Sequence, residues 1–145
     1  MNVQSILAAK GSAVATIDSA ATLADATSSL RDHGVGALVV SSDGSTIDGI
    51  LSERDVVRAL ASHGVSTLGR AVSTAMSGHV VTCVMSDSVD ELMAMMSEKR
   101  IRHLPVVDDA EALAGIVSIG DVVKARLGQL QKENDQLYDY IQGRA

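Results

Sequence analysis

The chain has almost no aromatic residues. Among its 145 residues there is no Phe and no Trp and there are only two Tyr, although 46% of the residues are hydrophobic. The core must therefore be built from Val, Ile, Leu, Ala and Met, which pack well on sheets and on helix faces. A chain this apolar, with moderate charge, is expected to fold rather than to stay disordered.

Cysteine, basic runs and long hydrophobic runs are also scarce. The single cysteine, Cys83, can form no disulfide within the chain, and we interpret it as a core residue of a strand. A formal net charge of −6 without clustered Lys and Arg argues against nucleic-acid binding. No apolar run approaches the ~20 residues that span a bilayer, and the N-terminus lacks the basic start of an export signal. We therefore expect no membrane partner and a cytoplasmic location.

The sequence contains one unit twice, offset by 66 residues. Residues 13–62 align with residues 79–128 without a gap, and twelve of the fifty aligned pairs are identical. The densest part of the match sets GILSERDVV at 49–57 against GIVSIGDVV at 115–123. Such a concentrated match indicates a duplicated unit with one shared fold.

Each unit is predicted to have the element order β-α-β-β-α, which makes the chain an α/β protein of the α+β type. Short runs rich in Val predict the strands. They lie at 13–17, 35–40 and 46–51 in the first unit and at 79–84, 101–107 and 112–117 in the second. Pairing the two units about a pseudo-two-fold axis would bury their apolar sheet faces and leave two related clefts.

The helices are predicted from their end signals. Thr22 and Ser88 are suited to N-caps, and Gly34 to the end of the first helix. Further helices are expected at 53–62 and from residue 119 onward.

These elements divide the chain into three parts. The first repeat, with an N-terminal helix, is assigned to residues 1–65. A linker helix, expected over 66–76, and the second repeat are assigned to residues 66–128. A C-terminal helical tail takes residues 129–145.

The repeated segment Gly-hydrophobic-hydrophobic-Ser-x-x-Asp carries the most chemistry. Ser52 and Ser118 stand at helix N-termini, where a hydroxyl and free N–H groups bind phosphate oxygens. Asp55 and Asp121 lie in the same first turns, and a carboxylate there accepts two hydrogen bonds from a ribose diol. The alternative is a plain capping box with serine as N-cap and aspartate three residues on. Both interpretations stay open at this point.

Residues 1–128 resemble a cystathionine-β-synthase-type domain pair, also called a CBS pair or Bateman module. The resemblance is carried by the two Gly…Ser-x-x-Asp segments, by the strand motif RHLPVV at 102–107, and by Thr16 and Thr82 at strand–helix openings. It implies a regulatory module, not an enzyme, that binds AMP, ADP, ATP or S-adenosylmethionine, with AMP as the first choice. It also implies an unidentified regulated protein that responds in trans. The alternative is a module with empty clefts that serves protein interaction or dimerisation.

The resemblance further implies two sets of ligand-binding residues. In each copy the Ser-x-x-Asp pair would hold phosphate and ribose, and residues of the strands would line the site. The second set is Thr82, Arg102, His103, Pro105, Ser118 and Asp121, and the first is Thr16, Ala37, Val39, Ser52, Arg54 and Asp55.

The two sets are not equivalent. Arg54 offers a phosphate-binding guanidinium where the second copy has Gly120. The second copy instead carries Lys99, Arg100 and Arg102, and if only one site is occupied we expect it to be the second. The alternative is that these basic residues simply face solvent.

Metal and catalytic chemistry have no visible pattern. The four histidines and the cysteine lack metal-ligand spacing, and no nucleophile–base set can be assembled from the sequence. We therefore expect no metal cofactor.

The last helix is predicted to continue as a heptad seam with one polar core position. A single Asn at such a position fixes register and oligomeric state. The seam comprises Val123, Leu127, Leu130, Asn134, Leu137 and Ile141. We expect a homodimer in which this tail takes part, and the alternative is a surface helix packed back on its own domain.

Overall fold

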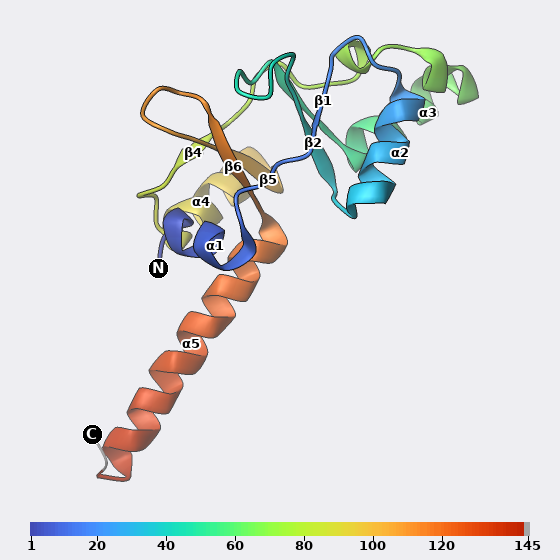
Figure 1. Cartoon of the computed structure of the whole chain (residues 1–145). Helices are drawn as coiled ribbons and strands as arrows, with labels where there is room; N and C mark the ends of the chain where they lie inside the picture. The colour runs from blue at the N-terminus through green and yellow to red at the C-terminus, as the bar shows by residue number, and fades with distance from the viewer. Residues whose placement is uncertain (144–145) are drawn as a thin grey trace.

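The computed structural model describes residues 1–143 and confirms the duplicated β-α-β-β-α order (Figure 1). The first repeat comprises β1 (Thr16–Ile17), α2 (Leu23–His33), β2 (Ala37–Val40), β3 (Gly49–Ser52) and α3 (Glu53–His63). The second comprises β4 (Cys83–Val84), α4 (Val89–Lys99), β5 (His103–Val107), β6 (Leu113–Ser118) and α5 (Ile119–Ile141). Helix α1 (Val3–Lys10) precedes the first repeat, and two 3-10 turns, η1 (Val65–Gly69) and η2 (Val72–Thr74), join the repeats.

Each repeat builds its own three-stranded mixed sheet. The strand orders are β1-β2-β3 and β4-β5-β6, with a parallel pair followed by an antiparallel hairpin in both. Corresponding residues pair in the two hairpins: Ala37 lies opposite Ser52, and His103 lies opposite Ser118. The predicted first strands are longer than those observed, since only two residues of each pair with the neighbouring strand.

The helix starts and stops follow the predicted signals. Thr22 and Ser88 are N-caps, as expected, and Gly34 ends α2 in the left-handed conformation with φ 64°. The second copy has Arg100 at the corresponding position, also left-handed with φ 55°. A non-glycine residue rarely adopts that conformation without surrounding constraint.

The single linker helix predicted over 66–76 is wrong. Residues 70 and 71 are extended because they are tied to the first repeat: Leu23 N–H donates to Arg70 O at 2.9 Å, and Val72 N–H donates to Ala21 O at 2.8 Å. This extended pairing interrupts the helical hydrogen bonds and leaves only the short turns η1 and η2.

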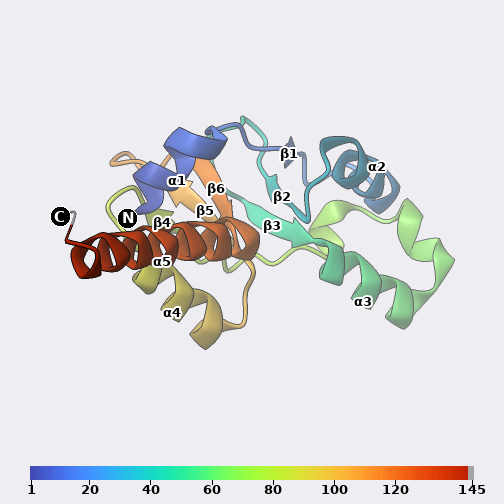
Figure 2. The ribbon, with the colours of Figure 1, turned by 90° about the horizontal axis from the view of Figure 1, so that it is seen from below.

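Two separate cores hold the repeats, and each is completed by a segment from outside its own repeat. Val72 of the linker is fully buried among α2, β2 and β3 of the first repeat. Val3, Ile6 and Leu7 of α1 are buried against the second repeat, and not against the first, to which this helix was predicted to belong. Helix α1 lies beside the start of α5 in two orthogonal views (Figures 1 and 2). Apolar periodicity predicts that a short helix is buried but not which sheet it covers.

A glycine in each sheet accepts these crossing segments at close range. A methyl group at Gly115 would lie 2.7 Å from Leu7 Cδ1, and one at Gly49 would lie 2.7 Å from Met76 Sδ and 2.8 Å from Ser77 O. The shared glycine of the repeated motif is therefore required by packing.

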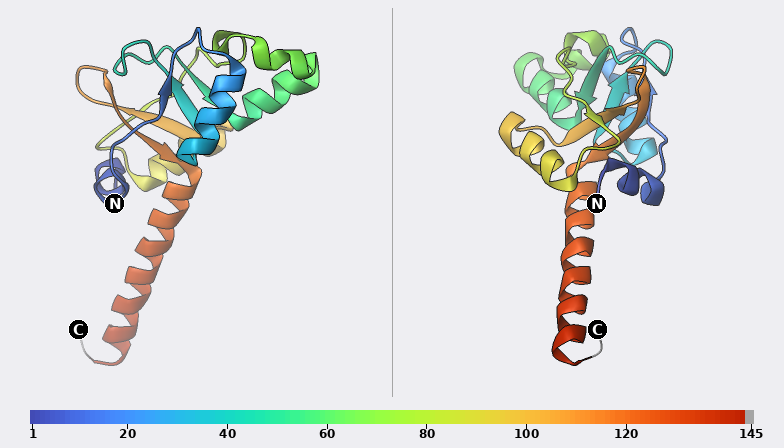
Figure 3. Two further views of the ribbon diagram at one scale, coloured as in Figure 1. Left: turned by 45° about the vertical axis from the view of Figure 1, so that its right-hand side comes forward. Right: turned by 90° about the vertical axis from the view of Figure 1, so that its left-hand side faces the viewer.

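Helix α5 leaves the body of the protein after its first turns and projects away from it (Figures 1 and 3). Its main contacts are with α1, α4 and β6. None of the helices in residues 1–143 combines the length and apolar character that a bilayer crossing requires.

Candidate functional site

The strand register brings the sequence-predicted residues together in two clusters. We define the second cluster as Thr82, His103, Pro105, Ser118 and Asp121, and the first cluster as Thr16, Ala37, Val39, Ser52 and Asp55. In the second cluster His103 pairs with Ser118, and Thr82 directly precedes Cys83, which pairs with Val106. In the first cluster Thr16 pairs with Val39, and Ala37 pairs with Ser52.

The two Ser-x-x-Asp segments form capping boxes. Ser52 N–H donates to Asp55 Oδ2 at 2.8 Å, and Ser118 N–H donates to Asp121 Oδ2 at 2.9 Å. The reverse bonds, from each aspartate N–H to the serine Oγ, measure 3.3 and 3.2 Å. Helices α2 and α4 begin with the same box, so the box alone does not mark a ligand site.

The boxes leave one carboxylate oxygen of each aspartate available. Within residues 1–143, no hydrogen bond is made by Oδ1 of Asp55 or of Asp121. The two side chains are 18% and 23% exposed. Each box thus holds its aspartate in place and leaves Oδ1 without a hydrogen bond, which is compatible with a role in ligand binding.

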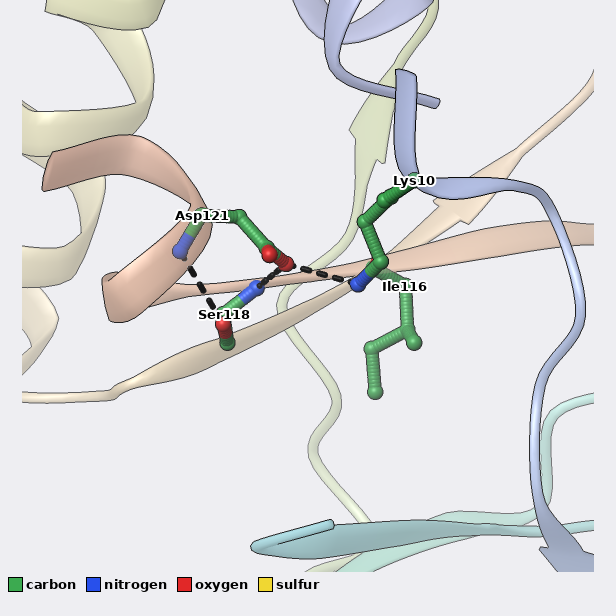
Figure 4. A network of polar contacts seen from close by, with 4 residues as sticks. All are labelled: Lys10, Ile116, Ser118 and Asp121. Atoms are coloured by element: carbon green, nitrogen blue, oxygen red, sulfur yellow. Dashed lines mark hydrogen bonds and ion pairs between the residues drawn. The ribbon is translucent and has the colours of Figure 1, made fainter. Parts of the chain in front are cut away.

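Lys10 completes the second cluster and is not among the site residues predicted from the sequence. Its Nζ lies 2.6 Å from Asp121 Oδ2 and donates to Ile116 O at 2.9 Å (Figure 4). Burial raises the pKa of Asp121, but the Lys10 and Ser118 hydrogen bonds outweigh it, and the pKa is lowered. No signal in the sequence points to Lys10, since it precedes the repeat and is brought in only by the packing of α1.

His103 stands where the two repeats meet. A methyl group at Gly36 of the first repeat would lie 3.2 Å from His103 Nε2 and 3.1 Å from Glu53 Oε1. Burial lowers the pKa of His103, and the positive charge of Arg102 lowers it further, whereas Glu53 and Asp121 act in the opposite direction. The ring is therefore neutral at pH 7, with one nitrogen to donate and one to accept.

Two pockets occupy corresponding places in the two repeats, between the end of one helix and the start of the next. The first, of about 450 Å³, is lined by Thr27, Leu30, Arg31, Gly34, Val35, Gly36, Glu53 and Val56. The second, of about 430 Å³, is lined by Arg54, Met93, Met96, Ser97, Arg100, Ile101, Arg102 and Ile119. Neither is lined by the Ser-x-x-Asp residues. His103 lies against Gly36 and Glu53, which line the first pocket, whereas its sequence neighbour Arg102 lines the second.

The second pocket is lined by three arginines together with Met and Ile side chains. Arg54 was assigned to the first site, but it reaches the pocket of the second repeat and lies there with Arg100 and Arg102. The ion pairs formed within residues 1–143 involve none of these three guanidinium groups. Unpaired guanidinium groups around one pocket favour an anionic ligand.

The part of the chain that the structure describes has two further features of chemical interest, its metal-ligand types and its cysteine. It contains no group of three or more His, Cys, Asp or Glu side chains that could hold a metal ion. Cys83 is buried in the second core, as expected for a packing residue, and burial, followed by the charge of Asp87, raises the pKa of its thiol to about 12.

Comparison with known proteins agrees with this architecture. The model of the CBS domain matches residues 11–62 and 71–128. A mitochondrial CBS domain-containing protein of Arabidopsis thaliana, CBSX3, is 38% identical over 126 residues, which are 84% of this chain and 61% of that protein. The chain spans roughly half to three fifths of the length of this protein and of two further curated relatives.

Solved structures show the same fold. The CBS-domain protein ATU1752 from Agrobacterium tumefaciens is 40% identical, with a TM-score of 0.83 over 87% of this chain and 99% of that one. The CBS domain pair of protein MJ0100, solved with 5′-methylthioadenosine and S-adenosylmethionine, is 26% identical, with a TM-score of 0.79 over 89% and 98%.

The lowered pKa of His103 predicts a pH-dependent stability. Below the ordinary histidine pKa of 6.5 the unfolded chain binds a proton that the folded chain resists, so the free energy of unfolding falls as the pH drops through that value. The slope stays below the ~1.4 kcal/mol per pH unit that one proton allows. His103→Gln is expected to remove this contribution in urea unfolding between about pH 5 and pH 8. His63→Gln, at an exposed helix end, is the control, and equal slopes for wild type and H103Q would contradict the assignment.

Proposed function

We propose, because the chain belongs to the CBS domain family, that it is a regulatory module that binds an adenine nucleotide where its two repeats meet. Two observations carry this proposal: the second cluster, and the three arginines of the second pocket. Asp121 offers an oriented carboxylate oxygen, His103 a neutral ring between the repeats, and the second pocket three unpaired guanidinium groups.

Each part of the ligand is assigned to the residues whose chemistry suits it. A ribose diol donates hydrogen bonds to Asp121, and Ser118 keeps that carboxylate oriented. Arg102 and Arg54 supply the charge that a phosphate requires, and they come from different repeats. A ligand held by both repeats favours one arrangement of the pair, and this shift is the signal passed to a partner protein.

AMP is the first choice among adenine ligands. The methylthioadenosine and S-adenosylmethionine bound to the MJ0100 pair support adenosine as the shared part of the ligand. The arginine cluster of this chain favours a phosphate in place of a sulfonium. A cytoplasmic location and a non-catalytic role stay predictions of the sequence.

Calorimetry with AMP tests the nucleotide site. We expect wild-type protein to bind AMP and Asp121→Ala to weaken binding at least tenfold, because a charged hydrogen-bond acceptor to the ribose contributes about 1.5–3 kcal/mol. Asp55→Ala is the matched variant in the other repeat and reports the contribution of the first cluster. Glu91→Ala removes the corresponding acid from a capping box outside both clusters and is the control. Binding that survives both aspartate substitutions, or no binding of AMP at all, would contradict the proposal.

We also propose that the chain is a homodimer assembled through α5. The seam residues that the sequence predicts are exposed along the projecting part of the helix: Leu127 is 62%, Leu137 58% and Ile141 70% exposed. The helix does not fold back on its own domain (Figure 3). Apolar side chains in this number are unfavourable in water, and a second copy of the same seam covers them, with Asn134 fixing the register.

Analytical ultracentrifugation tests whether α5 holds the dimer together. Wild-type protein is expected to sediment as a dimer, and Leu137→Lys is expected to weaken the dimer at least tenfold because it places a charge in the seam. Gln136→Lys puts the same side chain next to the seam and is expected to leave the dimer intact. A wild-type monomer at high concentration, or equal dimerisation of L137K and Q136K, would contradict this proposal.

A further inference from the structure

Lys10 makes the two clusters electrically different. In the second repeat its ammonium donates one hydrogen bond to the carbonyl oxygen of Ile116 and another to the carboxylate of Asp121 (Figure 4). In the first repeat the corresponding carbonyl, that of Ile50, accepts a backbone hydrogen bond from Ser77 N–H at 2.9 Å. A neutral peptide group thus stands where the second repeat has a cation.

Asp55 consequently lacks a close positive partner. Its nearest ion-pair contact, with Arg58 Nη1, is 3.9 Å long, and the Arg58 side chain is 75% exposed. Asp121 is paired at 2.6 Å with a lysine that is 33% exposed. Water screens the first contact far more than the second.

The packing of α1 fixes the position of Lys10. Val3, Ile6 and Leu7 anchor α1 in the second core, and Lys10 is the last residue of that helix. Gly11 then turns the chain away with φ 96°, a conformation that favours glycine. The ammonium is therefore delivered to Asp121 before any ligand arrives.

We infer that Lys10 determines which class of adenosine ligand the second cluster accepts. An unpaired carboxylate that receives a ribose repels the 5′-phosphate of the same ligand, since phosphate and diol are close together in one nucleotide. Lys10 cancels that repulsion because its ammonium neutralises the carboxylate of Asp121. The second cluster is therefore selective for phosphorylated adenosine, and the first, with Asp55 unneutralised, favours uncharged or cationic adenosine ligands.

This inference rests on the proposed nucleotide site and is tested by the ratio of two affinities. Calorimetry compares AMP with adenosine, which lacks the phosphate, in an Asp55→Ala background that leaves the second cluster. Lys10→Met keeps the length and apolar stem of the side chain and removes the charge. We expect it to weaken AMP binding about tenfold and to leave adenosine binding within about twofold, the size expected for one charge beside a partly exposed anion.

Two further variants separate this role from a structural one. Lys10→Arg is expected to retain the preference for AMP because it restores the charge. Lys124→Met, on an exposed face of α5, removes the same charge elsewhere and is expected to leave both affinities unchanged. Should Lys10→Met unfold, as judged by circular dichroism, Lys10→Gln replaces it in the same comparison.

The outcomes are distinct. An unchanged AMP-to-adenosine ratio in K10M, or an equal loss of both ligands, would overturn the role of Lys10 and leave the nucleotide site standing. Failure of the D55A protein, with Lys10 in place, to bind either ligand would overturn the nucleotide site at the second cluster, and the inference with it.

Discussion

The structure depends on the exchange of two short segments between the repeats. A three-stranded sheet with two helices leaves apolar surface uncovered, and each repeat covers it with the segment that precedes the other repeat along the chain. Val3 and Leu7 of α1 close the second core, and Val72 and Met76 of the linker lie against the first. Gly115 and Gly49 allow the close approach. The exchange ties the two repeats into one unit, because neither core is complete without a crossing segment.

The same exchange explains why duplicated sequences yield unlike sites. The crossing segments are not copies of each other: one is a helix that ends on Lys10, and the other is a chain of 3-10 turns whose Ser77 pairs by its backbone. The clusters are built from homologous strands and capping boxes, but their electrostatics come from these unlike neighbours. Arg54 adds to the difference, since it belongs to the first repeat and lies in the pocket of the second.

Much of the fold is predictable from the sequence because its signals are local. The strand runs of each unit, the caps at Thr22 and Ser88, and the stop at Gly34 each depend on residues near in sequence. Other features depend on backbone pairing or on contacts between residues about a hundred positions apart. They are the packing of α1 on the second repeat, the interruption of the linker, and the ion pair of Lys10 with Asp121. Periodicity carries no information on such partners, so the pairing of Lys10 with Asp121 could not be predicted from the sequence.

Determination of a crystal structure with AMP bound tests the central claim most directly. The account predicts AMP at the second cluster, with its ribose hydroxyls within hydrogen-bond distance of Asp121 and its phosphate directed toward Arg102. Lys10 should stay beside Asp121 in that complex. AMP bound away from both clusters, or clusters left empty in crystals grown at saturating AMP, would contradict the account.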